Sequence, residues 1–299
     1  MKVLVTGGHG QLGRGVVARG AARGDAIVAL DVDTLDLRDP AQLADQLARH
    51  APELVINAAA YTAVDRAETA RDDAHAINAA AVDHLARACA DRGTPWIQVS
   101  TDYVFDGAAR APYREDDPIA PLGVYGETKA AGEAIARAAG ATIVRTAWVF
   151  ATRGPSFVQT MLRLAAERPV LRVVADQHGC PTWADDLAGA LLALGALGLR
   201  GAAPATTYHY CGDGPTTWHG FATAIVGEAR RYRSLACDRI DAIATADYPT
   251  PARRPAYSVL DTTRIRALGI VPPAWQIGLA RVIADELGGP PGAPPTGAT

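Results

Sequence analysis

Tyr125 and Lys129 are the residues of this chain whose types and spacing most directly suggest chemistry. They stand four residues apart in the segment Tyr-Gly-Glu-Thr-Lys, and on a helix this spacing places both side chains on one face. Lysine is rare here, since of 29 basic residues only Lys2 and Lys129 are lysines. An ammonium group beside a phenol stabilises the phenolate, so we expect Lys129 to lower the tyrosine pKa from about 10. An ordinary surface pair is the alternative; the catalytic interpretation makes Tyr125 a proton donor.

Hydroxyl groups close one of the predicted strands. The apolar run Pro95–Ser100 is followed directly by Thr101 and Asp102, and in a parallel sheet such strand ends border the ligand crevice. A hydroxyl there can hydrogen-bond the carbonyl oxygen of a substrate beside the tyrosine proton. We choose Thr101 for this role, with Ser100 as the alternative. The plainer interpretation is a hydroxyl that caps the next turn.

A glycine-rich turn lies near the start of the chain, between a predicted strand and a predicted helix. Gly7, Gly10 and Gly13 are spaced three apart, which suits a tight turn that brings backbone N–H groups to a pyrophosphate. Asp31 ends the second predicted strand, where a carboxylate accepts hydrogen bonds from ribose hydroxyls and disfavours a 2′-phosphate. The turn therefore predicts a dinucleotide site, and Asp31 favours NADH over NADPH. Ordinary turns are the alternative for both features.

These features together predict hydride transfer. NADH or NADPH would deliver a hydride to a carbonyl carbon while Tyr125 protonates the developing alkoxide. Lys129 would hold the nicotinamide ribose and tune the tyrosine, and Thr101 would position the oxygen.

Alternating strands and helices are predicted for the first 150 residues and would position these groups. The predicted strands are short apolar runs bounded by Gly, Pro or polar residues: Lys2–Thr6, Ala26–Leu30, Leu54–Ala58, Pro95–Ser100 and Thr142–Thr146. Helical spacing lies between them at Ala41–His50, after the cap signal Asp39-Pro40, and at Ala74–Arg92. Such alternation predicts an α/β fold with a parallel sheet and right-handed crossovers.

The pattern loosens beyond Phe150. We expect helices at Ser156–Glu167, from Asp185 or Asp186 to Leu199, and at Phe221–Arg230, with strands at Pro169–Val174 and Tyr208–Asp213. Three prolines predict a packed loop at Asp247–Leu260. We expect residues 1–150 to form an NAD(P)-binding domain to which later segments return, and residues 151–287 mainly a substrate-binding lobe. Residues 288–299, rich in Gly and Pro, are expected to be a disordered tail.

Composition argues against several classes of protein. A net charge of −3 argues against a nucleic-acid partner, and no apolar run is long enough for a membrane span. The first residues already form a predicted strand, so we expect no secretory signal. The four cysteines are far apart, without a C-x-x-C pair: Cys89, Cys180, Cys211 and Cys237. We therefore expect reduced, buried thiols in the cytoplasm and no metal site.

Longer stretches carry a resemblance to a known family. They are Asn57–Glu68, Ser100–Gly107, Pro121–Lys129, Arg145–Trp148, Asp176–Thr182 and Arg254–Asp261. The glycine turn, the Ser-Thr-Asp strand end and Tyr-x-x-x-Lys resemble the extended short-chain dehydrogenases/reductases. The longer stretches resemble the dTDP-4-dehydrorhamnose reductase family within that superfamily, up to about residue 287. The resemblance implies a Rossmann-type doubly wound parallel sheet with a smaller C-terminal substrate-binding lobe.

The resemblance also implies an activity and its residues. The activity is NADH- or NADPH-dependent reduction of the 4-keto group of a dTDP-4-dehydro-L-rhamnose, with Thr101, Tyr125 and Lys129 catalytic. Beside Gly7 and Gly13, the cofactor-binding residues would be Gly10, Gln11, Leu12, Asp31, Asp36, Leu37, Ala60, Tyr61 and Thr62, together with Tyr125 and Lys129. The nucleotide-sugar would contact Val64, Asp65, Thr101, Asp102 and Trp148.

The chain departs from this family at two positions. Some members join two subunits through magnesium held by glutamates, and Gly15 stands at one of those positions. We therefore expect no metal, and either a monomer or a homodimer. Tyr257 stands where asparagine is usual. By charge alone, Arg145, Arg253 and Arg254 are candidates for a diphosphate, with solvated or ion-paired side chains as the alternative.

Two other functions stay open. A related reductase or epimerase of another deoxysugar nucleotide would use the same residues. A catalytically idle, cofactor-binding regulatory subunit is a different class, although such a protein has little reason to keep Thr101, Tyr125 and Lys129 together. In each case the expected small-molecule partner is a nucleotide-sugar or a dinucleotide, with no nucleic acid and no membrane.

Overall fold

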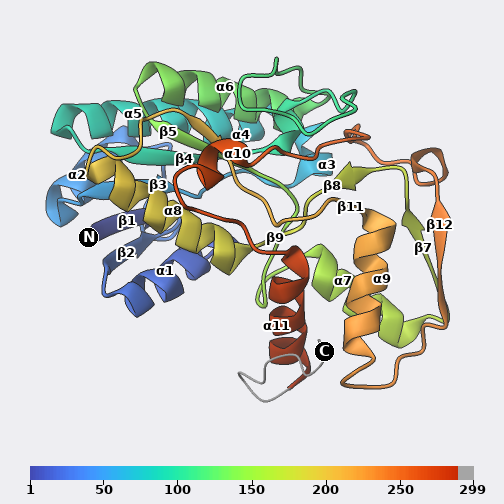
Figure 1. The fold of residues 1–299 in the computed structure, drawn as a ribbon. Helices are drawn as coiled ribbons and strands as arrows, with labels where there is room; N and C mark the ends of the chain where they lie inside the picture. Colours follow the sequence, from blue (N-terminus) through green and yellow to red (C-terminus); the bar gives the residue numbers. More distant parts are fainter. Residues whose placement is uncertain (289–299) are drawn as a thin grey trace.

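A parallel sheet of six strands forms the centre of the computed structural model, which describes residues 1–288 (Figure 1). The strand order is β2-β1-β3-β4-β5-β10, and each neighbouring pair is parallel. The bounds are β1 Lys2–Thr6, β2 Ala26–Leu30, β3 Leu54–Asn57, β4 Trp96–Thr101, β5 Thr142–Thr146 and β10 Thr207–His209. The first five confirm the predicted strands, with β3 ending one residue early and β4 shifted by one residue. β10 is shorter than the expected Tyr208–Asp213.

Helices cover both faces of this sheet (Figure 1). Val3 and Val5 of β1 pack with α1 (Gln11–Arg23) and α8 (Ala184–Leu199). Leu4 between them packs with α2 (Pro40–His50) and α5 (Ala81–Arg92). Alternate residues of β1 therefore pack into two different cores, which is why Val3–Val5 is a continuous apolar run in the sequence. This is the doubly wound α/β fold that the sequence predicts.

The predicted helix Ala74–Arg92 is interrupted. A single π-helical turn, Ala76–Ala80 (η1), follows α4 (Arg71–His75) and precedes α5. Asn78 in this turn accepts a hydrogen bond from the backbone N–H of Tyr61 (2.8 Å) and donates one to the Tyr61 carbonyl (3.1 Å). Such turns are frequent at functional sites, and here Ile77 from the turn lies on the wall of the cavity described below.

A second core lies in the C-terminal half of the chain. It is surrounded by α7 (Phe157–Glu167), α9 (Trp218–Ala229), α11 (Trp275–Leu287) and the parallel pair β7 (Val170–Val174) and β12 (Arg239–Ile243) (Figure 1). α7 and β7 confirm the predictions. α9 begins at Trp218 rather than Phe221, because the Thr217 side chain accepts a hydrogen bond from Gly220 and caps the helix. The sequence pattern predicts neither β12 nor α11.

Short elements complete the described chain. The parallel pair β6 and β9, the antiparallel pair β8 and β11 and four helical turns have these bounds: Val149–Phe150 (β6), His178–Gly179 (β8), Thr182–Trp183 (β9), Thr216–Thr217 (β11), Val64–Ala67 (α3), Thr263–Arg266 (α10), Asp102–Val104 (η2) and Thr245–Asp247 (η3). After η3, the proline-rich segment makes only isolated bridges, at Tyr257 and Leu260. Across residues 1–288, none of the helices combines the length and apolarity that crossing a membrane requires.

A buried ion pair ties α6 (Val124–Ala138) to the sheet. Arg145 of β5 is 1% exposed and donates hydrogen bonds of 2.8 and 2.7 Å to the carboxylate of Glu133, which is 0% exposed. The same guanidinium contacts the Glu115 carbonyl at 3.2 Å and the His209 ring at 3.4 Å. The interpretation of Arg145 as a diphosphate ligand is therefore wrong, because its charge is neutralised inside the core.

The division of the chain at residue 150 remains a prediction. α8 and β10 come from beyond that residue, yet α8 covers the sheet and β10 extends it. The tail expected at 288–299 lies, apart from Gly288, outside the described residues.

Candidate active site

A cavity of about 750 Å³ opens at the carboxyl edge of the sheet. Thr6, Leu30, Thr101 and Thr146 line it, and each is the last residue of its strand. Parallel strands end at the same edge, so residues far apart in sequence meet there. Most of the expected site residues line this cavity: Gly7, Gly10, Gln11, Leu12, Gly13, Asp31, Asp36, Leu37, Ala60, Thr62, Val64, Thr101, Asp102, Tyr125, Lys129 and Trp148. Tyr61 and Asp65 do not.

The glycine turn forms one end of the cavity. Gly7 has a φ of +67°, and a Cβ there would lie 2.8 Å from the Ala59 backbone. A Cβ on Gly13 would lie 2.2 Å from the Gly7 carbonyl oxygen. Side chains are thus excluded, and the start of α1, capped by Gly10 without a side-chain hydrogen bond, presents N–H groups that have no partner within the helix. This geometry suits a pyrophosphate.

Buried polar atoms along the walls also fit a polar ligand. Among residues 1–288, four side-chain oxygens that line the cavity have no hydrogen-bond partner: Gln11 Oε1, Ser100 Oγ, Asp102 Oδ2 and Thr146 Oγ1. Buried polar groups in folded proteins are nearly always satisfied. A dinucleotide, with its many hydroxyl and amide groups, would supply partners of the right chemistry for the Gln11, Ser100 and Thr146 oxygens.

Asp31 lies at the end of β2, where the adenosine end of a dinucleotide would reach. Its carboxylate accepts hydrogen bonds from the backbone N–H groups of His9 (2.7 Å) and Val32 (2.8 Å). These contacts hold a fixed negative charge on the cavity wall. Nearby, Arg38 binds both oxygens of Asp36, and this pairing lowers the pKa of Asp36 to about 2. Arg38 also lines the cavity, although the sequence analysis does not predict it as a site residue.

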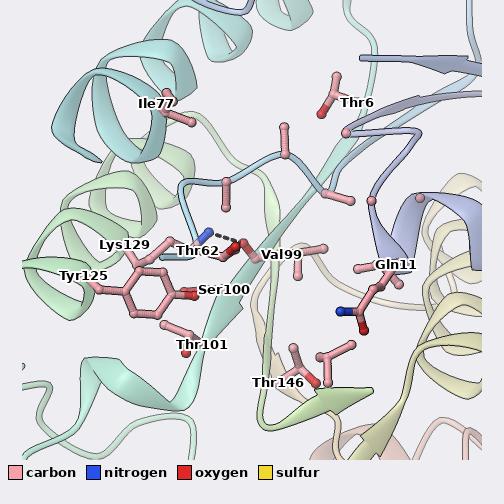
Figure 2. Close-up of a pocket in the computed structure, with 18 of the residues that line it drawn as sticks. Thr6, Gln11, Thr62, Ile77, Val99, Ser100, Thr101, Tyr125, Lys129 and Thr146 are labelled. Atoms are coloured by element: carbon pink, nitrogen blue, oxygen red, sulfur yellow. Dashed lines mark hydrogen bonds between the residues drawn. The ribbon is translucent and has the colours of Figure 1, made fainter. Parts of the chain in front are cut away.

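Tyr125 and Lys129 extend into the cavity from one face of α6, and Thr101 lies across from them (Figure 2). Lys129 is 4% exposed, and its ammonium group donates a 2.7 Å hydrogen bond to the Val99 carbonyl. A Cβ on Gly126 would lie 2.2 Å from the Tyr103 carbonyl oxygen. The absence of a side chain at Gly126 therefore lets the first turn of α6 approach η2, and this approach sets the tyrosine against the strand end.

The expected lowering of the Tyr125 pKa by Lys129 is wrong for the protein alone. Burial raises the pKa of Tyr125 to about 12, against an opposing effect of the neighbouring Thr101 hydroxyl. Burial also lowers the pKa of Lys129 to about 8, against the attraction of Glu133. Both pKa shifts have one cause, because burial away from water disfavours the charged form of each group. Tyr125 accordingly holds its proton at neutral pH, as a proton donor must.

Two stacked indole rings form another wall. Trp148 has a φ of +48°, and its ring lies 3.6 Å from that of Trp218 at an interplanar angle of 9°. A Cβ on Gly179 would come within 2.5 Å of the Trp148 ring. A bulky residue at positive φ is strained unless its surroundings fix it, and the stacking and the glycine fix it here.

Asp65 and Tyr61, both expected in the site, do not line the cavity. The Asp65 carboxylate binds the Arg254 guanidinium at 2.8 and 3.1 Å, and this pairing lowers the pKa of Asp65. Tyr61 packs beside Tyr125 in a small apolar cluster. Arg254 is therefore ion-paired, and Arg253 is exposed. Of the three arginines considered for a diphosphate, none lines the cavity.

Several residues that line the cavity are not predicted from the sequence. They are Thr6, His9, Leu30, Val32, Leu35, Arg38, Ile77, Val99, Tyr103, Thr146, Ala147, Val149 and Trp218. Position at a strand end could have indicated Thr6 and Thr146. Trp218 carries no such signal, because an aromatic residue at the start of a helix is usually core.

The residues around Gly15 do not fit the bridging magnesium of some relatives. Gly15 offers no ligand, and a Cβ there would already lie 3.1 Å from the Ala184 carbonyl oxygen. The adjacent cavity mixes Arg14 and Arg153 with the acidic residues Asp185, Asp285 and Glu286. Within residues 1–288, no three His, Cys, Asp or Glu side chains are grouped so as to hold a metal. No step of the reaction is assigned to a metal.

The chain is similar to proteins whose names describe one activity. The model of a family described as the RmlD substrate-binding domain matches residues 1–287. A dTDP-4-dehydrorhamnose reductase of Burkholderia thailandensis is 44% identical, covering 96% of this chain and 99% of its own. One from Streptomyces griseus is 45% identical, covering 90% and 88%.

A solved structure extends the similarity to three dimensions. The dTDP-4-dehydrorhamnose reductase of Bacillus anthracis, solved in complex with NADP, matches with a TM-score of 0.87 and 33% identity, covering 95% of this chain and 100% of that one.

Proposed function

The chain belongs to the family of the RmlD substrate-binding domain, and we propose that it is a dTDP-4-dehydrorhamnose reductase. It reduces the 4-keto group of dTDP-4-dehydro-L-rhamnose to give dTDP-L-rhamnose. One observation supports extending the activity of these relatives to this chain. Tyr125, Lys129 and Thr101 meet in the cavity that begins at the glycine turn.

The protein residues would act on the carbonyl oxygen. The glycine turn and Asp31 would hold NADH or NADPH, whose chemistry when bound would be to supply the hydride for the carbonyl carbon. Tyr125 gives its proton to the oxygen as negative charge develops there. Lys129, anchored at the Val99 carbonyl, stabilises the phenolate that this transfer leaves. Thr101 hydrogen-bonds the same oxygen and so aligns the carbonyl group with the tyrosine.

The nucleotide-sugar would occupy the part of the cavity bordered by the C-terminal half. Trp148 and Trp218 offer an apolar face suited to a 6-deoxysugar. Val64 and Asp102 would border the sugar, while Asp65, which lies outside the cavity, would act through its pair with Arg254.

Either nicotinamide cofactor is compatible with the family, and we propose NADH as the better substrate. Asp31 holds a negative charge at the end of β2, and that charge repels a 2′-phosphate. We also propose that the enzyme works in the cytoplasm as a monomer or homodimer. Its four cysteines are free and buried thiols, which suits a reducing compartment.

The test is consumption of NADH and of NADPH with enzymatically prepared dTDP-4-dehydro-L-rhamnose, with the sugar product identified by mass spectrometry and NMR. Turnover that yields dTDP-L-rhamnose supports the proposal. Equal or greater activity on other dTDP- or GDP-linked 4-keto sugars would instead indicate a related reductase. No oxidation with any keto sugar would contradict the proposal, and a tight complex with another enzyme would then indicate the regulatory subunit.

A further inference from the structure

Asp102 is a buried carboxyl group next to the reacting oxygen, and its protonation state has no role in the reaction as described so far. It follows Thr101 at the end of β4 and is 1% exposed. Its Oδ1 lies 3.0 Å from the Thr101 hydroxyl oxygen. Its Oδ2 is buried without a hydrogen-bond partner among residues 1–288. Burying a carboxylate with one oxygen unsatisfied is costly, so the arrangement favours a neutral carboxyl group.

The hydrogen bonds of Thr101 depend on whether Asp102 is protonated or ionised. A threonine hydroxyl has one proton and two lone pairs, and one lone pair accepts the backbone N–H of Tyr103 at 3.2 Å. An ionised Asp102 can only accept, so it takes the Thr101 proton and leaves a lone pair for the cavity. A protonated Asp102 donates to the second lone pair, and the Thr101 proton is then free for the cavity.

Only the second arrangement can help a carbonyl substrate. A carbonyl oxygen is an acceptor, so it needs a donor from Thr101 as well as the proton of Tyr125. In the first arrangement the lone pair of Thr101 faces the phenol, and the Tyr125 proton is drawn toward Thr101 rather than toward the substrate.

We propose that protonated Asp102 is the positioning residue that makes the Thr101 hydroxyl a hydrogen-bond donor for the carbonyl oxygen of the substrate. The proposal rests on the reductase function proposed above. It involves no transfer of the Asp102 proton to the substrate, which takes its proton from Tyr125.

The surroundings allow Asp102 to carry this proton. Burial raises the pKa of Asp102 to about 6, against the opposing effects of the Ser258 and Thr101 hydroxyls and of the backbone N–H groups of Asp102 and Tyr103. A carbonyl substrate that displaces water from the cavity would raise this pKa further. The neutral form is therefore accessible at physiological pH.

Other titratable groups around Asp102 stay neutral where it titrates. Tyr103 of η2, Tyr125 of α6 and Cys211 after β10 face it. Burial raises the pKa of the two tyrosines, and a hydrogen bond with Cys180, together with burial, raises that of Cys211. Lys129 shares the cavity and titrates at a pKa of about 8. The Asp65–Arg254 ion pair lies near enough to Tyr103 to act on its pKa, and the pairing keeps both groups charged in this range. A change in activity between about pH 6 and pH 8 that is lost in Asp102→Asn therefore reports Asp102.

The test compares the wild type with Asp102→Asn across this pH range, using kcat/KM for dTDP-4-dehydro-L-rhamnose at saturating NADH. Asparagine has the same shape, and its amide group can donate to Thr101 at every pH. We expect the ratio of Asp102→Asn to wild-type kcat/KM to rise about tenfold per pH unit above the Asp102 pKa, the slope of one ionisation. Asp102→Leu, of similar volume but without a donor, should be slow at every pH. A ratio independent of pH would overturn the proposal.

Two further variants guard against a misfolded Asp102→Asn protein. Ser258→Ala keeps Asp102 and removes a group that lowers its pKa, so the fall in wild-type activity should move to higher pH. Thr101→Val removes the hydroxyl through which Asp102 acts, so Asp102→Asn should have no pH-dependent effect in that background. An unmoved profile in Ser258→Ala, or an undiminished effect in the Thr101→Val background, would contradict the proposal.

A measurement without substrate separates this proposal from the proposed function. In protein labelled with ¹³C at aspartate carboxyl groups, the Asp102 signal is the one lost in Asp102→Asn. It should titrate near pH 6 and move to higher pH in Thr101→Val, because the hydroxyl favours the ionised form. If no keto sugar is reduced but this coupling is found, the proposed function is contradicted and the proposed coupling of Asp102 to Thr101 is supported. An Asp102 titration that is unchanged in Thr101→Val would contradict the proposed coupling itself.

Discussion

Tyr125 shows how burial, more than neighbouring charge, controls proton supply at the scale of single residues. The phenol holds its proton because a dry wall disfavours phenolate, and its pKa is raised to about 12. The ammonium of Lys129 is drawn to the Val99 carbonyl rather than to the phenol. The lysine then matters chiefly after the tyrosine has given up its proton, when the phenolate needs a positive neighbour.

Tyr125→Phe should separate binding from catalysis. Loss of the phenolic proton removes general acid catalysis, which contributes about 10²–10⁴-fold, so kcat should fall by that order. The ring that lines the cavity is kept, so NADH affinity should not change. Stopped-flow turnover and NADH fluorescence titration measure the two effects. Wild-type turnover in Tyr125→Phe would exclude the tyrosine as the proton donor.

Lys129 predicts an alkaline limit to activity. The group is charged below its pKa of about 8 and neutral above it, so kcat should fall as pH rises through 8. The test uses the Asp102→Asn background, in which Asp102 no longer titrates. There Lys129→Arg keeps its charge, so although its rigid fork should reduce kcat, the fall near pH 8 should disappear. A fall at the same pH in both proteins would assign the limit to another group. The pH profile of kcat at saturating substrates distinguishes the two.

At the scale of elements, glycine contacts fix the distances between the helices and strands that carry the site. Gly126 allows α6 to approach the Tyr103 carbonyl, and Gly132 of the same helix lies against the Asn78 carbonyl of the π turn, where a Cβ would come within 2.1 Å. Helix α6 is thus placed by two backbone contacts, one between Tyr125 and Lys129 and one three residues beyond Lys129.

Gly126→Ala should reduce turnover without changing any catalytic side chain. The new methyl group would meet the Tyr103 carbonyl at 2.2 Å, so α6 must shift and carry Tyr125 away from Thr101. Misplacement by about 1 Å can lower kcat about 10²-fold. Gly189→Ala on α8 is the matched control, because a Cβ there meets nothing within 4 Å. Equal kcat in the two variants would show that this approach does not set the site.

The buried network beside β5 should make the protein sensitive to acid. His209 is 0% exposed, its Nδ1 lies 3.1 Å from the Tyr113 carbonyl, and burial and the Arg145 guanidinium lower its pKa to about 3. Between its unfolded pKa of about 6.5 and that value, only the unfolded chain binds the proton, so stability falls by up to about 1.4 kcal/mol per pH unit as pH decreases.

His209→Gln should remove this part of the acid dependence. Its free energy of unfolding, from urea titrations at several pH values, should fall less steeply below pH 6.5 than that of the wild type. His75→Gln, at an exposed position, should keep the wild-type slope. A wild-type slope in His209→Gln would mean that His209 is not kept neutral by the fold.

Elements differ in how far sequence can predict them. β1 to β5 are predictable because each contains a short run rich in Val, Ile or Leu that is bounded by Gly, Pro or polar residues. β12 (Arg-Ile-Asp-Ala-Ile) is not predictable from the sequence, because this short segment forms a strand only through its parallel pairing with β7. The π turn at Ala76–Ala80 has no sequence signature separate from that of a helix. The glycine turn and Tyr125/Lys129 are predictable as local motifs, whereas the raised tyrosine pKa depends on walls contributed by distant segments.

At the scale of the whole molecule, the cavity is shared between the two halves of the chain. The strand ends and α6 come from the first half, and Trp218 comes from the second. The Asp65–Arg254 pair joins α3 to the proline-rich segment that lies against Tyr103. Both side chains of the pair are partly exposed, at 41% and 23%, so its contribution to stability is expected to be below about 1 kcal/mol.

Arg254→Ala should therefore affect substrate more than stability. Loss of the pair frees the segment beside Tyr103, and we expect KM for the nucleotide-sugar to rise by about tenfold, equivalent to about 1.4 kcal/mol, with KM for NADH unchanged. Arg253→Ala, a neighbouring change at an exposed position, should alter neither value. Parallel increases of both KM values in Arg254→Ala would indicate a general loss of structure rather than a local one.

The stacked indoles of Trp148 and Trp218 have an optical consequence. Two chromophores held face to face at 3.6 Å couple their electronic transitions, so the near-ultraviolet circular dichroism spectrum should contain a bisignate band that either tryptophan variant abolishes. Because both rings border the cavity, a sugar lying on them would perturb that band. The enzyme would thus carry a built-in, label-free spectroscopic gauge of ligand occupancy.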